Sequence, residues 1–134
     1  MKVSKKWIIR NYLEFNKKYF DNKLPIVKFN IDHNKYVFGY ADFENDYVNN
    51  TIIPYSISIS NYYDTPEEVK KNTLLHEMIH IYEYITYPMR FFGNRYKYYN
   101  GHGMFFQMNA ALINKDGWNI LTTLPIDQVK TFKK

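Results

Sequence analysis

Thr73-Leu74-Leu75-His76-Glu77-Met78-Ile79-His80 is the stretch around which the rest of the chain is organised. Its two histidines are four residues apart, which places them about 40° apart around an α-helix, so both imidazoles lean onto one face and can share a cation. Glu77 projects at a neighbouring angle, where it can contact a water on that cation. The stretch therefore predicts a helix that carries two metal ligands, His76 and His80, and a general base.

The flanking residues predict where this helix begins and ends. Thr65-Pro66-Glu67-Glu68 has the form of a capping box, with its threonine as N-cap and Pro66 as the first helical residue. Pro88 cannot donate a backbone hydrogen bond and pushes the residue before it toward extended geometry, so we expect the helix to end at about Thr86. The segment is apolar over most of its circumference, which indicates a helix in the middle of a domain.

Hydrophobic periodicity predicts the other elements of a single domain over residues 1–134. An amphipathic helix follows Ser4, whose hydroxyl suits an N-cap, and a further helix opens at Gly101-His102-Gly103. Alternating apolar residues predict three strands, at 26–31, 36–43 and 51–60. Segment 89–100 is rich in Tyr, Phe and Arg and is expected to be an aromatic loop that crosses the site. Segment 118–134 is expected to be a C-terminal extension with a short strand or turn.

Two residues within the predicted strands carry positional information. Gly39 indicates a bulge or a close backbone approach, and Pro54 confines its end of strand 51–60 to a sheet edge or a bulge. An edge strand beside a metal-binding helix could pair with an extended substrate backbone and position a peptide bond over the metal. An ordinary edge strand without that role is the equal alternative.

Composition restricts the kinds of site that the chain can hold. The chain has 134 residues, 46% of them hydrophobic and 19% aromatic, which is typical of one folded globular domain. There is no cysteine, which excludes disulfides, thiol nucleophiles and cysteine-ligated zinc. A zinc ion would therefore have to be held by His, Asp or Glu.

Charge and the N-terminal sequence bear on partners and on location. Lys and Arg outnumber Asp and Glu by 18 to 13, a net charge of +5, which suits polyanionic partners. A solvated basic surface and a nucleic-acid track remain equal alternatives. The apolar run Trp7-Ile8-Ile9 is too short for a signal peptide or a membrane span, so we expect an intracellular protein that is not secreted and has no membrane partner. We also expect a monomer.

Zinc catalysis requires a third protein ligand and an open position for water. His102 stands between two glycines at a predicted helix start, where the backbone can approach a metal closely and the helix dipole favours the neutral, ligating imidazole. His33 lies in an early turn, and Glu83 lies one turn beyond His80 on the same helix, so it is expected to support the site or face solvent. His102 is accordingly the preferred third ligand.

The residues together resemble a known family. His76-Glu77-Met78-Ile79-His80 followed by Gly101-His102-Gly103-Met104-Phe105-Phe106 is similar to the SprT-like (Spartan-type) metalloprotease family, and the similarity extends over about residues 8–115. The resemblance implies Zn²⁺ bound by His76, His80 and His102, with Glu77 catalytic. It also implies an α+β zincin-like fold that has an N-terminal helix, a three-stranded mainly antiparallel sheet, the central HExxH helix and a following helix.

The resemblance further implies proteolysis of proteins that are attached to or crosslinked with DNA. Many relatives carry a cysteine zinc ribbon after this domain, whereas this sequence lacks one. DNA contact, to single-stranded or damaged DNA, would therefore depend on the lysines and the aromatic loop of this domain. Candidates for an oxyanion donor, by position only, are the aromatic-loop residues Arg95, Tyr96, Tyr98 and Tyr99.

Two other functions use the same residues. A zinc-stabilised DNA-binding module would cleave nothing, but a purely structural site gains nothing from a carboxylate such as Glu77 beside an open coordination position. A zinc hydrolase that acts on another amide or ester would use the same ligands and the same base.

Overall fold

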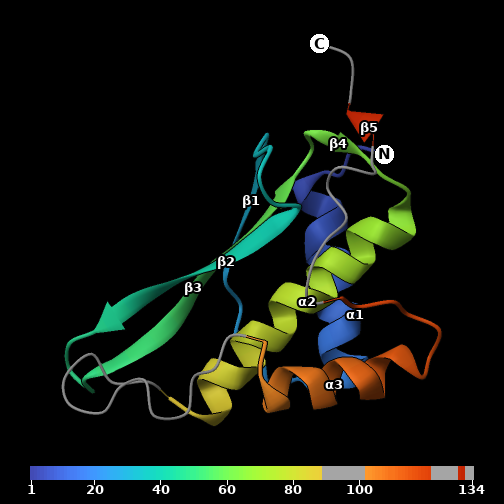
Figure 1. The fold of residues 1–134 in the computed structure, drawn as a ribbon. Helices are drawn as coiled ribbons and strands as arrows, with labels where there is room; N and C mark the ends of the chain where they lie inside the picture. Colours follow the sequence, from blue (N-terminus) through green and yellow to red (C-terminus); the bar gives the residue numbers. More distant parts are fainter. Residues whose placement is uncertain (89–101, 122–129, 132–134) are drawn as a thin grey trace.

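The computed structural model describes residues 1–88, 102–121 and 130–131. In those residues three helices pack beside a three-stranded sheet, and a second, two-stranded sheet lies at one end, so the fold class is α+β as predicted (Figure 1). The elements along the chain are α1 (Lys5–Tyr19), β1 (Lys28–Asp32), β2 (Gly39–Asp46), β3 (Thr51–Ser60), β4 (Tyr63–Asp64), α2 (Glu67–Thr86), α3 (Met104–Asn114) and β5 (Lys130–Thr131).

The larger sheet is mixed, with strand order β1-β3-β2. Strand β3 pairs in parallel with β1 and antiparallel with β2. The turn after β1 therefore joins two strands that are not neighbours, because it passes over the end of β3. The hydroxyl of Ser60 donates to the carbonyl of Asn34 in that turn, and the backbone N–H of Ser60 donates to Phe38. The side chain of Asn34 accepts from the N–H groups of Tyr36 and Val37, which is why β2 begins at Gly39 and not at Tyr36.

Strand β3 has the bounds that were predicted, but it is the central strand, so the expectation of an edge strand at 51–60 was wrong. Residues 56–60 of β3 are all buried, as a strand with neighbours on both sides should be. The other role predicted for Pro54, a place at a bulge, is confirmed: the register shifts between Asp42 and Phe43, and Phe43 pairs with Pro54. The bulge accommodates a residue that has no N–H to donate to the ladder.

Strand β2 is an edge strand of this sheet and lies along α2. A Cβ atom on Gly39 would stand 2.8 Å from the carbonyl oxygen of Ser58 and 2.9 Å from Cγ2 of Thr73 on α2, so Gly39 marks the close backbone approach that was one of its two predicted roles. Four residues further along β2, Phe43 stacks on Tyr84 of α2 with ring centroids 3.8 Å apart. The strand therefore follows α2 from Thr73 to Tyr84.

Helix α2 ends at Thr86 as predicted, but its first turn differs from the expected capping box. Pro66 is the N-cap, with extended ψ of 160°, and no side chain caps the helix. Thr65 directly follows β4, is buried, and its carbonyl accepts from the amino group of Met1, so it is held outside the cap position. Glu67 accepts from the indole N–H of Trp7 on α1, which connects the starts of the two helices.

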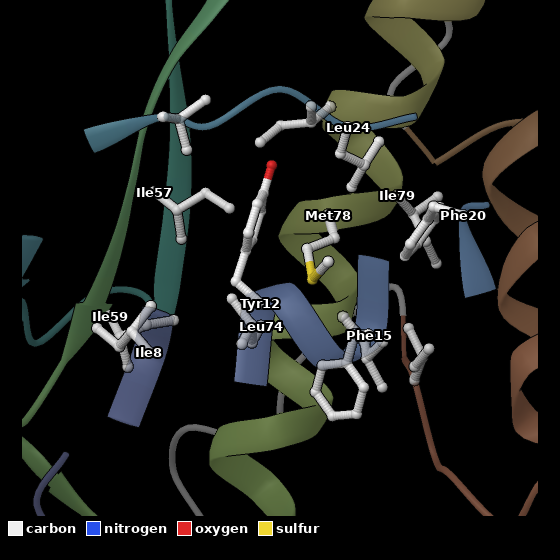
Figure 2. Close-up of a cluster of buried hydrophobic side chains, with 14 of the residues drawn as sticks. Ile8, Tyr12, Phe15, Phe20, Leu24, Ile57, Ile59, Leu74, Met78 and Ile79 are labelled. Atoms are coloured by element: carbon white, nitrogen blue, oxygen red, sulfur yellow. The ribbon is translucent and has the colours of Figure 1, made fainter. Parts of the chain in front are cut away.

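The core lies between α1, α2 and the sheet. Ser4 caps α1 as predicted, by accepting from the N–H of Trp7. Figure 2 shows Tyr12 and Phe15 of α1 beside Met78 of α2, with Ile57 of β3 on the sheet side, and these four residues belong to one buried cluster. Among the described residues no helix combines the length and the apolar character that crossing a bilayer requires.

Candidate metal centre

Three histidine side chains converge between α2 and the start of α3. The Nε2 atoms are 3.3 Å apart between His76 and His80, 3.2 Å between His80 and His102, and 3.0 Å between His76 and His102. These are the histidines that the sequence indicated, and the structure brings all three together. In the described residues they form the one group of His, Asp and Glu side chains that could hold a metal ion.

The spacing of the three nitrogens fits a tetrahedral ion. Zn–N bonds of about 2.0–2.1 Å at tetrahedral angles place neighbouring ligand nitrogens about 3.3 Å apart. Nδ1 of His76 must carry its proton, because it lies 2.7 Å from the carbonyl oxygen of Leu121, which can only accept. Its Nε2 therefore presents a lone pair toward the other two rings, as a metal-binding imidazole nitrogen must.

Burial keeps the imidazoles in the neutral form that binds metal. Desolvation lowers the pKa of His76 to about 4, with the neighbouring His102 adding to the effect, although the hydrogen bond to Leu121 opposes it. Desolvation also lowers the pKa of His80 to about 3, with His76 and His102 as further causes. The pKa of His102 is lowered by burial as well. The three rings are thus neutral at neutral pH, the form in which an imidazole can bind a metal ion.

A phenylalanine forms the floor beneath the three rings. Phe106 of α3 is fully buried, and its ring centroid lies 4.7 Å from that of His76, 4.9 Å from His80 and 4.8 Å from His102. His76 is buried and His80 half-buried, whereas His102 is exposed, so the site opens to solvent on the side of His102. The sequence did not indicate this role of Phe106, because only the fold brings α3 beside α2.

Glu77 lies inside the protein between α2 and β2. Its side chain is 6% exposed, and burial raises its pKa to about 8, against the opposing effect of a hydrogen bond from the backbone N–H of Ala41. The N–H of Ser60 donates to Phe38, and ladder bonds of an antiparallel pair involve every second residue, so the N–H of Ala41 points away from β3 toward the outer edge. The edge of β2 therefore supplies a donor that holds the carboxylate of Glu77, a contact that sequence analysis missed.

The remaining candidates lie elsewhere. His33 is exposed in the turn after β1 and is not part of the histidine group. Glu83 does not face solvent: it is 3% exposed, and burial raises its pKa. Its Oε1 atom has no hydrogen-bond partner among the described residues, and Glu83 is not part of the histidine group either. Arg95, Tyr96, Tyr98 and Tyr99, with the rest of the predicted aromatic loop, lie outside the described residues.

Comparison with known proteins agrees with this geometry. A search of curated protein sequences finds no match to the chain. The sequence does match the SprT-like family over residues 8–128, which include most of α1, the three-stranded sheet, α2 and α3 and all four residues of the predicted site. Because the match covers nearly the whole sequence, the chain belongs to the SprT-like family.

Proposed function

We propose that this chain is a zinc-dependent endopeptidase that hydrolyses peptide bonds in proteins associated with or crosslinked to DNA. The observation that carries the proposal is the convergence of three Nε2 atoms within 3.0–3.3 Å of one another, with the buried Glu77 next to the first of them in the sequence. Three imidazoles and an open position are the ligand set of catalytic zinc. Membership of the SprT-like family supports the same reaction.

The roles of the residues follow from their chemistry. His76, His80 and His102 would hold the zinc ion, which when bound acidifies water and polarises a carbonyl as a Lewis acid. Glu77 accepts the proton of the attacking water and returns it to the leaving nitrogen. Its raised pKa suits a group that takes up and releases a proton near neutral pH, and the N–H of Ala41 holds the carboxylate in place.

An extended substrate would find an edge strand beside this site. In the part of the chain that the structure describes, the outer edge of β2 pairs with no other strand. The backbone pairing first proposed for residues 51–60 is therefore proposed for the part of β2 from Phe43 onward, because the outward N–H of Ala41 already donates to Glu77. Proteins associated with DNA are proposed as substrates because of the family and the net charge of +5.

The test compares Glu77→Gln with a matched substitution on the same helix. Zinc-loaded protein is incubated with a basic DNA-binding protein, and Glu68→Gln, which alters an exposed carboxylate in the first turn of α2, serves as the control. We expect Glu77→Gln to bind one zinc ion and to fold normally while its rate of cleavage falls at least a hundredfold, because proton transfer contributes about 10²–10⁴ to such rates. Glu68→Gln should cleave as fast as the wild type.

The other outcomes would contradict either the role of Glu77 or the proposed reaction. Full activity of Glu77→Gln would show that this carboxylate is not the base. Bound zinc without cleavage of any protein would favour a non-catalytic module or a hydrolase of another amide or ester.

A further inference from the structure

The outer side of α3 carries a row of exposed apolar side chains. Met104, Met108 and Leu112 are 77%, 58% and 59% exposed, and each follows the one before it by four residues. They lie between about 160° and 240° around the helix from Phe106 and extend over about 12 Å along its axis. We call these three residues the apolar row. Because Phe106 is the floor of the metal centre, the apolar row faces away from that centre.

Helix α3 also differs from the other two described helices in its charge. The sequences of α1 and α2 each contain six charged residues, whereas none of the 11 residues of α3 is charged. The side of α3 toward the core is apolar too, with Phe106, Ala110 and Ile113 buried. A helix that is apolar around most of its circumference is normally buried on all sides. We therefore expect another surface to cover the apolar row.

The spacing of the apolar row suits a second copy of the same chain. A two-fold axis beside Met108 would bring Met108 of both copies together and place Met104 opposite Leu112 of the other copy, because these two residues are each four positions from the centre. Side chains four residues apart form the ridges that interdigitate when two helices cross at about −50°. The row is thus self-complementary, as an interface between identical copies must be.

Charge favours the same occupant. The net charge of +5 makes two copies repel each other, but contact through α3 brings no charged side chain into the interface. Lys115 is the first charged residue after the row and is seven positions from Met108. In an antiparallel pair the two Lys115 side chains would be about 20 Å apart, beyond the Debye length of about 8–10 Å. Recognition of a different protein usually relies on charged groups, and a membrane-surface helix on a broad apolar face beside cations, and α3 has neither.

The size of the apolar row indicates how strong the contact is. Side chains with these exposures offer on the order of 300 Å² of apolar area per copy, so two copies with their surrounding polar residues would bury roughly 1,000 Å². Stable complexes bury about 1,200–2,000 Å². The contact therefore belongs to the weak and reversible class, for which we expect a Kd on the order of 10–100 μM.

We propose that the apolar row of α3 is the surface through which two copies of this chain associate reversibly, about a two-fold axis beside Met108. The row faces away from the histidines, so both metal centres stay open in the pair. The association is independent of the proposed function, because it uses no residue of the metal centre and no step of a reaction.

The first experiment measures the average molar mass of zinc-loaded protein by sedimentation equilibrium, between about 2 μM and about 500 μM. We expect the mass of the wild type to rise from one chain toward two chains over this range. Met108→Glu should remain a single chain throughout, because the two-fold axis would bring two carboxylates together inside an apolar contact. Leu13→Glu is the matched control, since it adds the same charge at a residue of α1 that is 48% exposed, and it should associate as the wild type does.

Three results would overturn the proposal. A wild type that stays a single chain at every concentration would do so, in agreement with the monomer expected from the sequence. Equal association of Met108→Glu and the wild type would place the contact elsewhere. Equal loss of association in Met108→Glu and Leu13→Glu would mean that net charge and not the apolar row controls it. None of these results depends on catalysis, so a failure of the proposed peptidase would leave each of them readable.

The second experiment tests the two-fold axis with charge-swapped pairs. Met108→Glu and Met108→Lys should each be monomeric alone, but an equimolar mixture of the two should associate at least as tightly as the wild type, because opposite charges then meet at the axis. Met104→Glu mixed with Leu112→Lys should associate as well, since these positions face each other across the axis. Circular dichroism checks that each variant folds, as substitutions at exposed positions should allow. Mixtures that remain monomeric would exclude this arrangement.

Discussion

Helix α2 has ionisable side chains that are buried in the interior of the protein. Lys70 is 4% exposed, and its Nζ donates to the carbonyl oxygens of Ser60 at 2.8 Å and Tyr63 at 3.1 Å, at the turn between β3 and β4. Burial lowers its pKa to about 8, although Asp64 opposes the effect. About two turns further along the same side of the helix, burial raises the pKa of Glu77 to about 8. The same cause, loss of water, therefore favours the neutral form of both residues.

The shift at Lys70 predicts how stability depends on pH. The pKa of Lys70 is about 8 in the folded chain and 10.5 for the ordinary side chain, so between these values the unfolded chain binds more protons and the free energy of unfolding rises with pH. Urea unfolding of the wild type and of Lys70→Met should show this. The difference in unfolding free energy should shift by about 1 kcal/mol in favour of the wild type from pH 7.5 to pH 9.5, a value reduced for the partial solvent access of the amine.

Lys71→Met is the matched control for this prediction. Lys71 is next to Lys70 in the sequence, its side chain is half-buried, and it forms neither of those hydrogen bonds. Its difference from the wild type should stay constant over the same pH range. A constant difference for Lys70→Met as well would show that Lys70 titrates alike in the folded and unfolded chains.

At the scale of elements, the packing of β2 on α2 depends on a small residue at the point of closest approach. Gly39 has no room for a Cβ atom, because the backbone of Ser58 and the side chain of Thr73 both lie within 3 Å of the Cβ position. The same strand supplies the N–H of Ala41 to Glu77. A displacement of β2 would therefore affect both stability and the proposed base.

We accordingly predict that Gly39→Ala destabilises the protein by about 1–3 kcal/mol in urea unfolding, as overpacking of an interior usually does. Adding Thr73→Ser removes the contact with Cγ2, which lies 2.9 Å from the Cβ position, but leaves the contact with the Ser58 carbonyl. The double variant should therefore recover part of the loss. No recovery would mean that the backbone contact alone causes the strain.

At the scale of the whole molecule, a bound metal ion would join α2 to the start of α3. His76 and His80 belong to α2, whereas His102 precedes α3 by two residues and is separated from His80 by 22 positions in the sequence. Ligands from distant parts of a chain converge only in the folded state, so a metal that binds them stabilises that state.

Zinc should therefore raise the stability of the metal-free protein. At a free zinc concentration about a thousandfold above Kd, the free energy of unfolding should increase by about 4 kcal/mol. His102→Asn should lose most of this increase, while His33→Asn, at an exposed histidine outside the site, should keep all of it. The measurement is thermal unfolding with zinc and with EDTA. An unchanged response in His102→Asn would exclude this residue as a ligand.

The sequence alone determined the features that depend on local spacing. The bounds of β3, the end of α2 and the cap of α1 follow from periodicity, proline and a hydroxyl within a few residues, so their signals are contained in the segments themselves. The i, i+4 spacing of His76 and His80 likewise requires only a helix. His102 was indicated because the chain has only four histidines and this one lies between two glycines at a helix start. Its distance from His80 in the sequence did not indicate it.

Only the tertiary structure established the contacts between segments far apart in the sequence. The insertion of β3 between β1 and β2, the floor that Phe106 forms under the histidines, and the hydrogen bond from Ala41 to Glu77 all depend on which elements pack together. Burial of Glu83 is of the same kind. The physical reason is that side-chain patterns specify which face of an element is buried, whereas the partner that buries it is set by the packing of the complete core.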